Sequence, residues 1–236
     1  MTPAASEVSK LSVKHRVLYY DGRPVTATSL DDGLSKFLNW LKAKKHVLLL
    51  AHNAKSFDAK HLFKALASCG KIDEFCQIAL GFSDTLPAFR ELYPDRKSFS
   101  QQNLATDLLS ATYNAHSALD DVQVLQKLST SFISDAVLLR HSFSNSWLQQ
   151  YIVFLSQKSK TLKTLQPLIH LKKASKSMAD KISASGLSLD HLQLAYSRGG
   201  VDGLTNVLTE KFQGKPRVST NKRVIKTTIC SYFQNE

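Results

Sequence analysis

The chain has 236 residues, of which 43% are hydrophobic, and it carries a formal net charge of +12. This composition is enough for one substantial hydrophobic core and an appendage. No apolar run approaches the ~20 residues that a membrane-spanning helix needs, and the first residues are too polar for a secretory signal peptide, so we expect no contact with a membrane.

The three cysteines, Cys69, Cys76 and Cys230, form an odd set whose spacing matches no metal-binding pattern. We interpret them as small buried hydrophobic residues. Unpaired cysteines of this kind are typical of a reducing compartment. We therefore expect an intracellular protein of the nucleus or the cytoplasm.

The first half of the chain alternates between strand and helix patterns. Ser29 is a predicted N-cap, and its helix continues to about Ala43. The run at 46–51 is short and apolar, as expected of a buried strand. Strands are predicted at 16–20, 46–51 and about 76–80, and helices at 29–43, 53–70, 84–92, 100–110 and 117–132. Such alternation predicts a three-layer α/β domain over residues 1–133.

A helical region, residues 134–236, is predicted after this domain, and it holds most of the net charge. Residues 1–155 contain 17 Lys and Arg against 14 Asp and Glu, a net +3, whereas residues 156–236 contain 14 against 5, a net +9. Such asymmetry indicates a polyanionic partner, although a lysine-rich surface can also be merely solvated.

Two features of this region have more than one interpretation. Two short helices joined at Gly199-Gly200 predict an αα-hairpin, which either presents backbone amides to phosphates or serves only as a packing unit. Trp147 and Tyr151 lie four residues apart, and we expect them in the core of a helix rather than in a platform that stacks on bases.

A first cluster of chemically capable residues follows the strand at 46–51. At about 100° per residue, Asp58 shares a helix stripe with Leu62 and Leu66, so its carboxylate is predicted to face inward. An acidic residue in a first turn often only complements the helix dipole. An apolar face, however, does not suit a carboxylate unless that group is paired or binds a metal.

A second cluster begins at His116, five residues before Asp121. Val122 and Leu125 belong to an apolar helix stripe that includes Asp121 and excludes Asp120. We therefore interpret Asp120 as a residue that complements the helix dipole, and Asp121 as a second carboxylate that faces inward.

Together the two clusters resemble the second and third motifs of the DEDDh family of 3′–5′ exonucleases, which have a ribonuclease-H-like fold. Their spacing is similar to that of the three-prime repair exonuclease branch and of the exonuclease-like C-terminal domain of promyelocytic leukaemia protein. The residues that match the second motif are His52, Asn53, Phe57 and Asp58, and those that match the third are His116 and Asp121.

The resemblance implies a nuclease site that acts on DNA or RNA at 3′ ends. Two Mg²⁺ or Mn²⁺ ions with oxygen ligands would stabilise the attacking and leaving oxygens of phosphodiester hydrolysis. The resemblance assigns Asp58 and Asp121 to the metal ions and gives His116 the role of a base toward the attacking water. It assigns substrate binding to His52, Asn53 and Phe57.

The family's first motif, an Asp-x-Glu on the first strand, has no counterpart in this sequence. The acids before residue 58 are Glu7, Asp21, Asp31 and Asp32, and none has a second acid two residues away on an apolar strand. We therefore expect a ribonuclease-H-like mixed sheet that lacks its first strand, within an N-terminally incomplete exonuclease-like domain.

Two functional classes remain open. In the first, the protein is a 3′–5′ exonuclease, a hydrolase, and this chain carries most of its site. In the second, the chain is a catalytically silent exonuclease-like module that binds nucleic acid or a protein partner. The missing acidic pair favours the second class for this chain, whereas the joint presence of Asp58, His116 and Asp121 favours exonuclease ancestry.

Overall fold

The structure is a computed structural model that describes residues 6–7, 9–15, 17–115 and 117–234. The chain forms two compact units, Met1–Gln149 and Gln150–Glu236, and each has buried hydrophobic residues of its own. Among the residues just given, no helix is both long and apolar enough to span a membrane.

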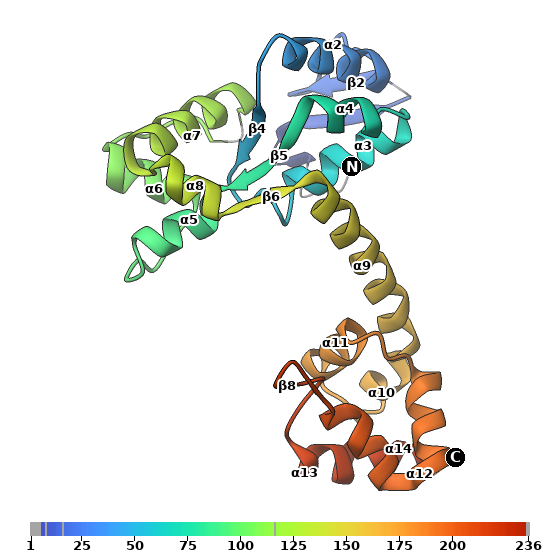
Figure 1. The fold of residues 1–236 in the computed structure, drawn as a ribbon. Coiled ribbons are helices and arrows are strands. Elements are labelled where there is room, and N and C mark those ends of the chain that lie inside the picture. The colour runs from blue at the N-terminus through green and yellow to red at the C-terminus, as the bar shows by residue number, and fades with distance from the viewer. Residues whose placement is uncertain (1–5, 8, 16, 116, 235–236) are drawn as a thin grey trace. The chain divides into compact units, whose positions relative to one another are not determined.

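The N-terminal unit combines short strands with helices (Figure 1). Its elements are β1 (Leu11–Lys14), β2 (Val17–Tyr20), β3 (Arg23–Pro24), α2 (Leu30–Lys42), β4 (Val47–Ala51), α3 (Asp58–Ser68), α4 (Ile72–Ile78), β5 (Ala79–Asp84), α5 (Thr85–Leu92), α6 (Gln101–Leu109), α7 (Ala118–Phe132), α8 (Asp135–Arg140), β6 (Ser142–Ser144) and the start of α9 (Asn145–Thr164). Strands β1 to β3 form a small antiparallel sheet.

The main sheet has the strand order β4-β5-β6. Strand β4 runs parallel to β5, with Ala51 opposite Asp84, and β6 is antiparallel to β5. Helices lie on either side of β4 and β5 (Figure 1). The mixed sheet and its helices confirm the expected ribonuclease-H-like α/β class. Within the described residues β4 pairs with β5 alone, so its other edge has no strand neighbour.

Local sequence signals explain several of these elements. The Ser29 side chain accepts a hydrogen bond from the backbone N–H of Asp32 at 3.1 Å, which caps α2 as predicted. Behind the main sheet, the rings of Phe63 and Phe75 meet edge to face at 5.7 Å, and Phe82 on β5 completes the cluster. These aromatic contacts join α3 and α4 to β5.

Two elements differ from the sequence expectation. The strand expected at 76–80 begins only at Ala79, because the preceding residues form α4 and bury Phe75. Strand β6 was not predicted at all, since three residues are too few to show a period. Its pairing with β5 extends the N-terminal unit beyond residue 133, the domain end expected from the sequence.

The C-terminal unit is helical, as expected, with one short hairpin that the sequence did not predict. After the end of α9 its elements are α10 (Gln166–His170), α11 (Lys176–Ala184), α12 (Leu189–Thr209), β7 (Lys211–Phe212), β8 (Lys215–Pro216), α13 (Lys222–Val224), a π-helical turn (Ile225–Ile229) and α14 (Cys230–Phe233). Gly200 has φ 55° and kinks α12, which confirms the predicted pair of helices joined at Gly199-Gly200. Leu192 and Leu208, one from each half of α12, are buried in the core.

Candidate functional site

A groove of about 810 Å³ lies along β4, between α3 and α7. It is lined by β4 residues, by the turn that follows β4, and by one face of each helix. The lining residues are Leu49, Leu50, Ala51, His52, Asn53, Phe57, Asp58, His61, Leu62, Phe82, Gln101, Asp121, Val122 and Leu125. Five of the six residues that the exonuclease resemblance singled out are therefore brought to one groove.

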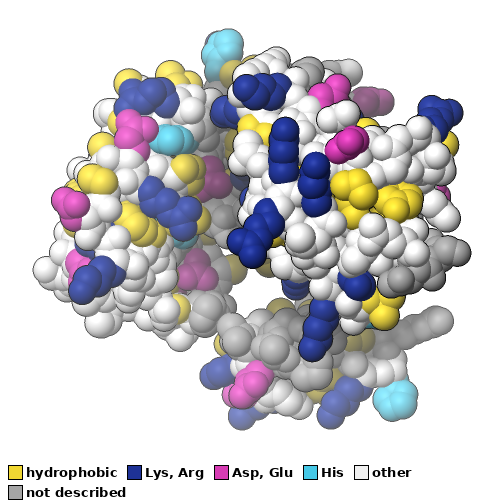
Figure 2. Space-filling view, turned by 90° about the horizontal axis from the view of Figure 1, so that it is seen from below, with side chains coloured by type: hydrophobic (Ala, Val, Ile, Leu, Met, Phe, Trp, Pro, Cys, Tyr) yellow, Lys and Arg dark blue, Asp and Glu magenta, His cyan; other side chains and the backbone are white. Residues whose placement is uncertain are grey.

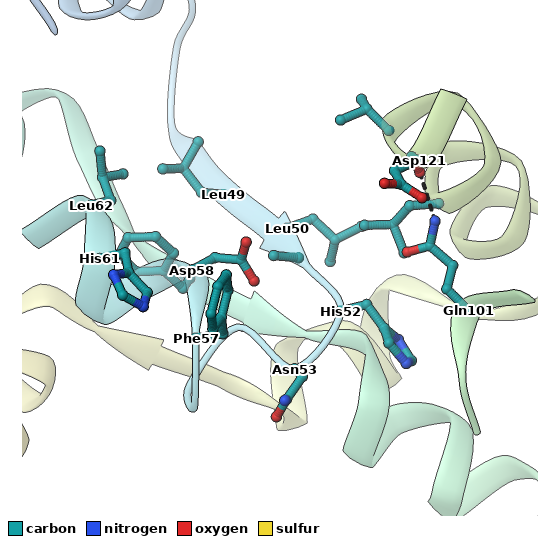
Figure 3. Close-up of a pocket in the computed structure, with 14 residues that line it drawn as sticks. Leu49, Leu50, His52, Asn53, Phe57, Asp58, His61, Leu62, Gln101 and Asp121 are labelled. Atoms are coloured by element: carbon teal, nitrogen blue, oxygen red, sulfur yellow. Dashed lines mark hydrogen bonds between the residues drawn. The ribbon is translucent and has the colours of Figure 1, made fainter. Parts of the chain in front are cut away.

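The two motif carboxylates do not converge on one point in this groove. Asp58 is the first residue of α3 and Asp121 lies in the first turn of α7. Figure 3 shows them on opposite sides of β4, with Leu50 between them. The apolar stripe that accompanies Asp121 also faces this groove rather than a closed core, since Val122 is 63% exposed.

Asp58 occupies an open but partly desolvated position. Its side chain remains accessible to solvent, yet the surrounding protein desolvates the carboxyl and raises its pKa, and the nearby Asp84 carboxylate raises the pKa further. A backbone hydrogen bond and the histidines His61 and His52 oppose this shift. Asp58 therefore carries a charge that a cation in the groove would stabilise.

Asp121 is half-buried and already has protein partners. The Gln101 side chain donates a hydrogen bond to the Asp121 backbone carbonyl at 2.8 Å. Burial raises the pKa of Tyr113, and so does the hydrogen bond between its hydroxyl and the Asp121 carboxylate. A ligand of Asp121 would have to share the carboxylate with this tyrosine.

Asp84 holds the turn beside the groove, and the motifs did not predict this role. It is only 5% exposed, and it accepts hydrogen bonds from the backbone N–H groups of Asn53 at 2.9 Å, Lys55 at 3.1 Å and Leu86 at 3.0 Å. These bonds fix the turn after β4, where Asn53 takes the left-handed φ of 65°. The strand-to-helix boundary indicates an N-cap at Asp84, but its reach to the other turn depends on β4 pairing with β5.

His52 directs both ring nitrogens to protein partners. Nε2 lies 2.8 Å from the carbonyl oxygen of Phe99, and Nδ1 lies 2.9 Å from the hydroxyl oxygen of Thr85. Burial lowers the pKa of His52, so we assign the neutral ring, with Nε2–H donating to Phe99 and Nδ1 accepting from Thr85. In this arrangement His52 positions the turn, and its predicted contact with substrate stays a prediction.

Phe57 and His61 form an aromatic rim beside Asp58. Phe57 is 60% exposed, and its ring centroid lies 4.5 Å from that of His61. Figure 3 shows both rings on the Asp58 side of the groove. The second motif includes Phe57 but not His61, which the sequence could have indicated by its position three residues after Asp58 on the same helix.

The described side chains do not fit a two-metal centre. His116 lies outside the described residues, so its role as a base stays a prediction. Across the described ranges, no group of three or more His, Cys, Asp and Glu side chains is placed to hold a metal ion. Asp58 and Asp121 stand on opposite sides of β4, and both oxygens of Asp84 accept backbone N–H groups.

Two family models match separate parts of the chain. Residues 23–129 match the family model described as Exonuclease, and residues 161–236 match the one described as PML, C-terminal domain. The chain is thus exonuclease-like in its N-terminal unit and similar to the PML C-terminal domain in its C-terminal unit, which confirms the resemblance drawn from the motifs.

A human protein is similar to most of this chain. The protein named Protein PML is 26% identical to this chain over 180 residues. The aligned part covers 75% of this chain but only 19% of Protein PML. The chain therefore corresponds to a small part of that relative.

Proposed function

We propose that the chain is a nucleic-acid-binding exonuclease-like module that is catalytically silent with the side chains described above. The single observation that carries this proposal is the groove along β4. It gathers Asn53 from the turn after β4, Phe57 and Asp58 from the start of α3, and Asp121 from α7, so the motif residues share one concave surface. That surface has apolar walls for bases and polar groups at its rim.

The C-terminal unit supplies the electrostatic part of the proposal. Asp180, Asp202 and Glu210 each form an ion pair with a Lys or Arg of the same unit, and the remaining basic residues leave this region with a net +9. Figure 2 shows Lys and Arg side chains gathered on the surface of this unit. Because the groove carboxylates repel phosphates, we assign most of the salt-dependent affinity to this basic surface.

Catalytic silence follows from the donor set in the groove. The exonuclease family generally uses divalent metals, and Asp58 and Asp121 would be ligands of Mg²⁺ or Mn²⁺ only in a site completed by further carboxylates. The runner-up function is an active 3′–5′ exonuclease, with His116 as the base. It is favoured by the two motif carboxylates, which both line the groove.

A third role is that of a protein-binding module, which the match to the PML C-terminal domain supports. The expected location in the nucleus or the cytoplasm likewise stays a prediction. Nucleic-acid binding is the function that the groove and the basic surface support together, and its substrates would be DNA or RNA with 3′ ends.

Fluorescence anisotropy with labelled single-stranded and duplex DNA and RNA tests the proposal. We expect affinity to fall steeply with salt. Replacing four exposed lysines of the C-terminal unit with Gln should reduce the salt slope by roughly 3, since each phosphate that a lysine neutralises adds about 0.7 to 0.9 to that slope. The four lysines are Lys172, Lys176, Lys211 and Lys215.

A matched control removes the same charge from the other unit. Four of the exposed lysines of that unit are replaced with Gln: Lys36, Lys45, Lys64 and Lys97. We expect this variant to keep most of the salt slope. Equal effects of the two variants on the salt slope would show that binding depends only on net charge. If the protein binds none of these nucleic acids, the proposed function is rejected.

A further inference from the structure

A second cavity, of about 540 Å³, lies within the N-terminal unit and plays no part in the function argued above. It is lined by the turn after β4, the start of α5, and the segment that joins α8 to α9. The lining residues are Lys55, Asp84, Pro87, His141, Ser142, Phe143, Ser144 and Trp147. It thus combines an aromatic wall with a cation and the two hydroxyl groups of Ser142 and Ser144.

Trp147 forms the aromatic wall, contrary to our expectation that it lies in a helix core. The side chain is 37% exposed, and its ring centroid lies 5.3 Å from that of Phe143. Phe143 in turn stacks on the buried Phe82 at 5.7 Å with an interplanar angle of 16°. This chain of rings anchors Trp147 to the core while leaving part of the indole accessible from the cavity.

Lys55 supplies the cation. Its Nζ atom lies 4.6 Å from the centroid of the Trp147 ring, which is a cation–π contact. The backbone N–H of Lys55 is held by Asp84. The turn is therefore fixed, while the flexible four-carbon stem still lets the ammonium group move.

The cavity and the groove along β4 flank the same turn. Asn53 lines the groove and Lys55 lines the cavity, with the buried Ala54 between them. Two residues of extended chain span at most about 7 Å, and a stacked nucleic-acid strand rises about 3.4 Å per nucleotide. A strand with its end in the groove would therefore reach the cavity within a few nucleotides.

We propose that Trp147 and Lys55 form a second nucleotide subsite for single-stranded nucleic acid. The base stacks on the Trp147 ring face that Lys55 covers in the unbound protein, and the Lys55 ammonium turns to the adjacent phosphate. Stacking on an aromatic ring combined with a cation at the phosphate is the general chemistry of sequence-tolerant strand binding. This proposal rests on the proposed nucleic-acid function. In it, Trp147 and Lys55 position the strand.

The chain contains a matched pair that serves as a control. Lys44 lies 5.6 Å above the ring of Trp40, and Trp40 is 58% exposed. Trp40 is thus more exposed than Trp147 and has the same kind of cation partner. Trp40 does not line the groove along β4 or the cavity beside Trp147. The two tryptophans therefore share an exposed ring and a nearby lysine, but of the two only Trp147 lines that cavity.

The experiment uses the two tryptophans, the only ones in the chain, as reporters. In the 236-residue Trp40→Phe variant, Trp147 is the sole tryptophan. We expect octameric oligo-dT and oligo-U to quench its fluorescence, with the same Kd that anisotropy gives. In the reciprocal Trp147→Phe protein, Trp40 should show no such quenching. Trp147→Leu should weaken binding at least about fivefold, and Lys55→Met should lower the salt slope by about 0.7.

The outcomes separate this subsite from the function on which it rests. If the oligonucleotides bind by anisotropy while Trp147 fluorescence does not change, the subsite is rejected and the proposed function stands. If neither signal changes at any concentration, the proposed function fails, and the subsite fails with it. The quenching measurement uses a protein in which Trp147 is unchanged. It therefore tests the subsite even if Trp147→Leu does not fold.

Discussion

The two sides of the turn after β4 use the same side chain in opposite ways. Asp84 and Asp58 both stand at the start of a helix beside this turn. Asp84 is buried and accepts three backbone N–H groups, whereas Asp58 faces an open groove with a raised pKa. A carboxylate at a helix start is structural where backbone N–H groups saturate it, and it is available for ligands where they do not.

The strands that precede these two residues, β5 before Asp84 and β4 before Asp58, also differ in how closely they are packed. Strand β5 is paired on both sides, and Phe82 in it is buried among aromatic rings. Strand β4 has, within the described residues, a strand partner on one side only, and all five of its residues are half-buried. We therefore expect substitutions on the β5 side to affect stability and those on the β4 side to affect binding.

The largest effect is expected for Gly81→Ala on the closed side. A Cβ atom at Gly81 would overlap the backbone carbonyl of Phe143, so β5 and β6 would have to separate. We expect a loss of about 3 kcal/mol in the free energy of unfolding, measured by urea denaturation. Gly33→Ala is the control, since nothing lies within 4 Å of a Cβ at that helix position, and it should stabilise by about 0.5–1 kcal/mol. Equal effects of the two changes would contradict the packing of β6 on β5.

Asp84→Ala should come next. It leaves three backbone N–H groups of a tight turn without their acceptor, and we expect a cost of about 2–3 kcal/mol. Urea denaturation measures this cost, and Asp58→Asn is the matched change on the open side, expected within about 0.5 kcal/mol of the parent protein. The comparison breaks down if Asp58→Asn is as damaging as Asp84→Ala.

We expect His52 to give the free energy of unfolding a pH dependence of intermediate size. Because burial lowers the pKa of His52 from 6.5, the unfolded chain binds a proton more readily than the native protein. The free energy of unfolding should therefore fall as the pH drops below 6.5. His52→Asn should flatten this part of the pH profile in chemical denaturation. An unchanged slope would show that the ring is not held neutral by Phe99 and Thr85.

The smallest effect is the pH dependence of Asp58. Because the pKa of Asp58 is raised above 3.8 in the native protein, the native state holds its proton more tightly than the unfolded chain does. Its contribution to stability is therefore lost as the pH rises above 3.8. Asp58→Asn should remove this decline, and thermal unfolding at several acidic pH values measures it. A steeper decline in the variant would contradict the desolvated position of Asp58.

Much of the fold was predictable from the sequence, because the hydrophobic period of a long segment indicates whether it is a helix or a strand. The N-cap at Ser29 and the helices that carry Asp58 and Asp121 lie where capping and periodicity place them. The short β6 strand and the β7–β8 hairpin were not predictable, since so few residues show no period. Their formation depends on partners elsewhere in the chain.

The candidate site was predictable in its membership but not in its geometry. The motifs predicted that Asp58 and Asp121 belong to one site, and both line the same groove. The motif spacing did not indicate that the two residues stand on opposite sides of β4. Asp84 and Trp147 were missed or misplaced because their roles depend on residues far away in sequence, at Asn53 and at Lys55. Spacing within one helix carries no information about such contacts.

A combined binding and cleavage assay on DNA and RNA oligonucleotides, with Mg²⁺ or Mn²⁺, tests whether the groove binds nucleic acid without cleaving it. The label sits at the 3′ end for anisotropy and at the 5′ end for gel analysis of length. We expect salt-sensitive binding with no shortening, because the described carboxylates do not assemble a two-metal centre. Robust shortening from the 3′ end that disappears in Asp121→Asn would contradict it and show that the chain is a complete exonuclease.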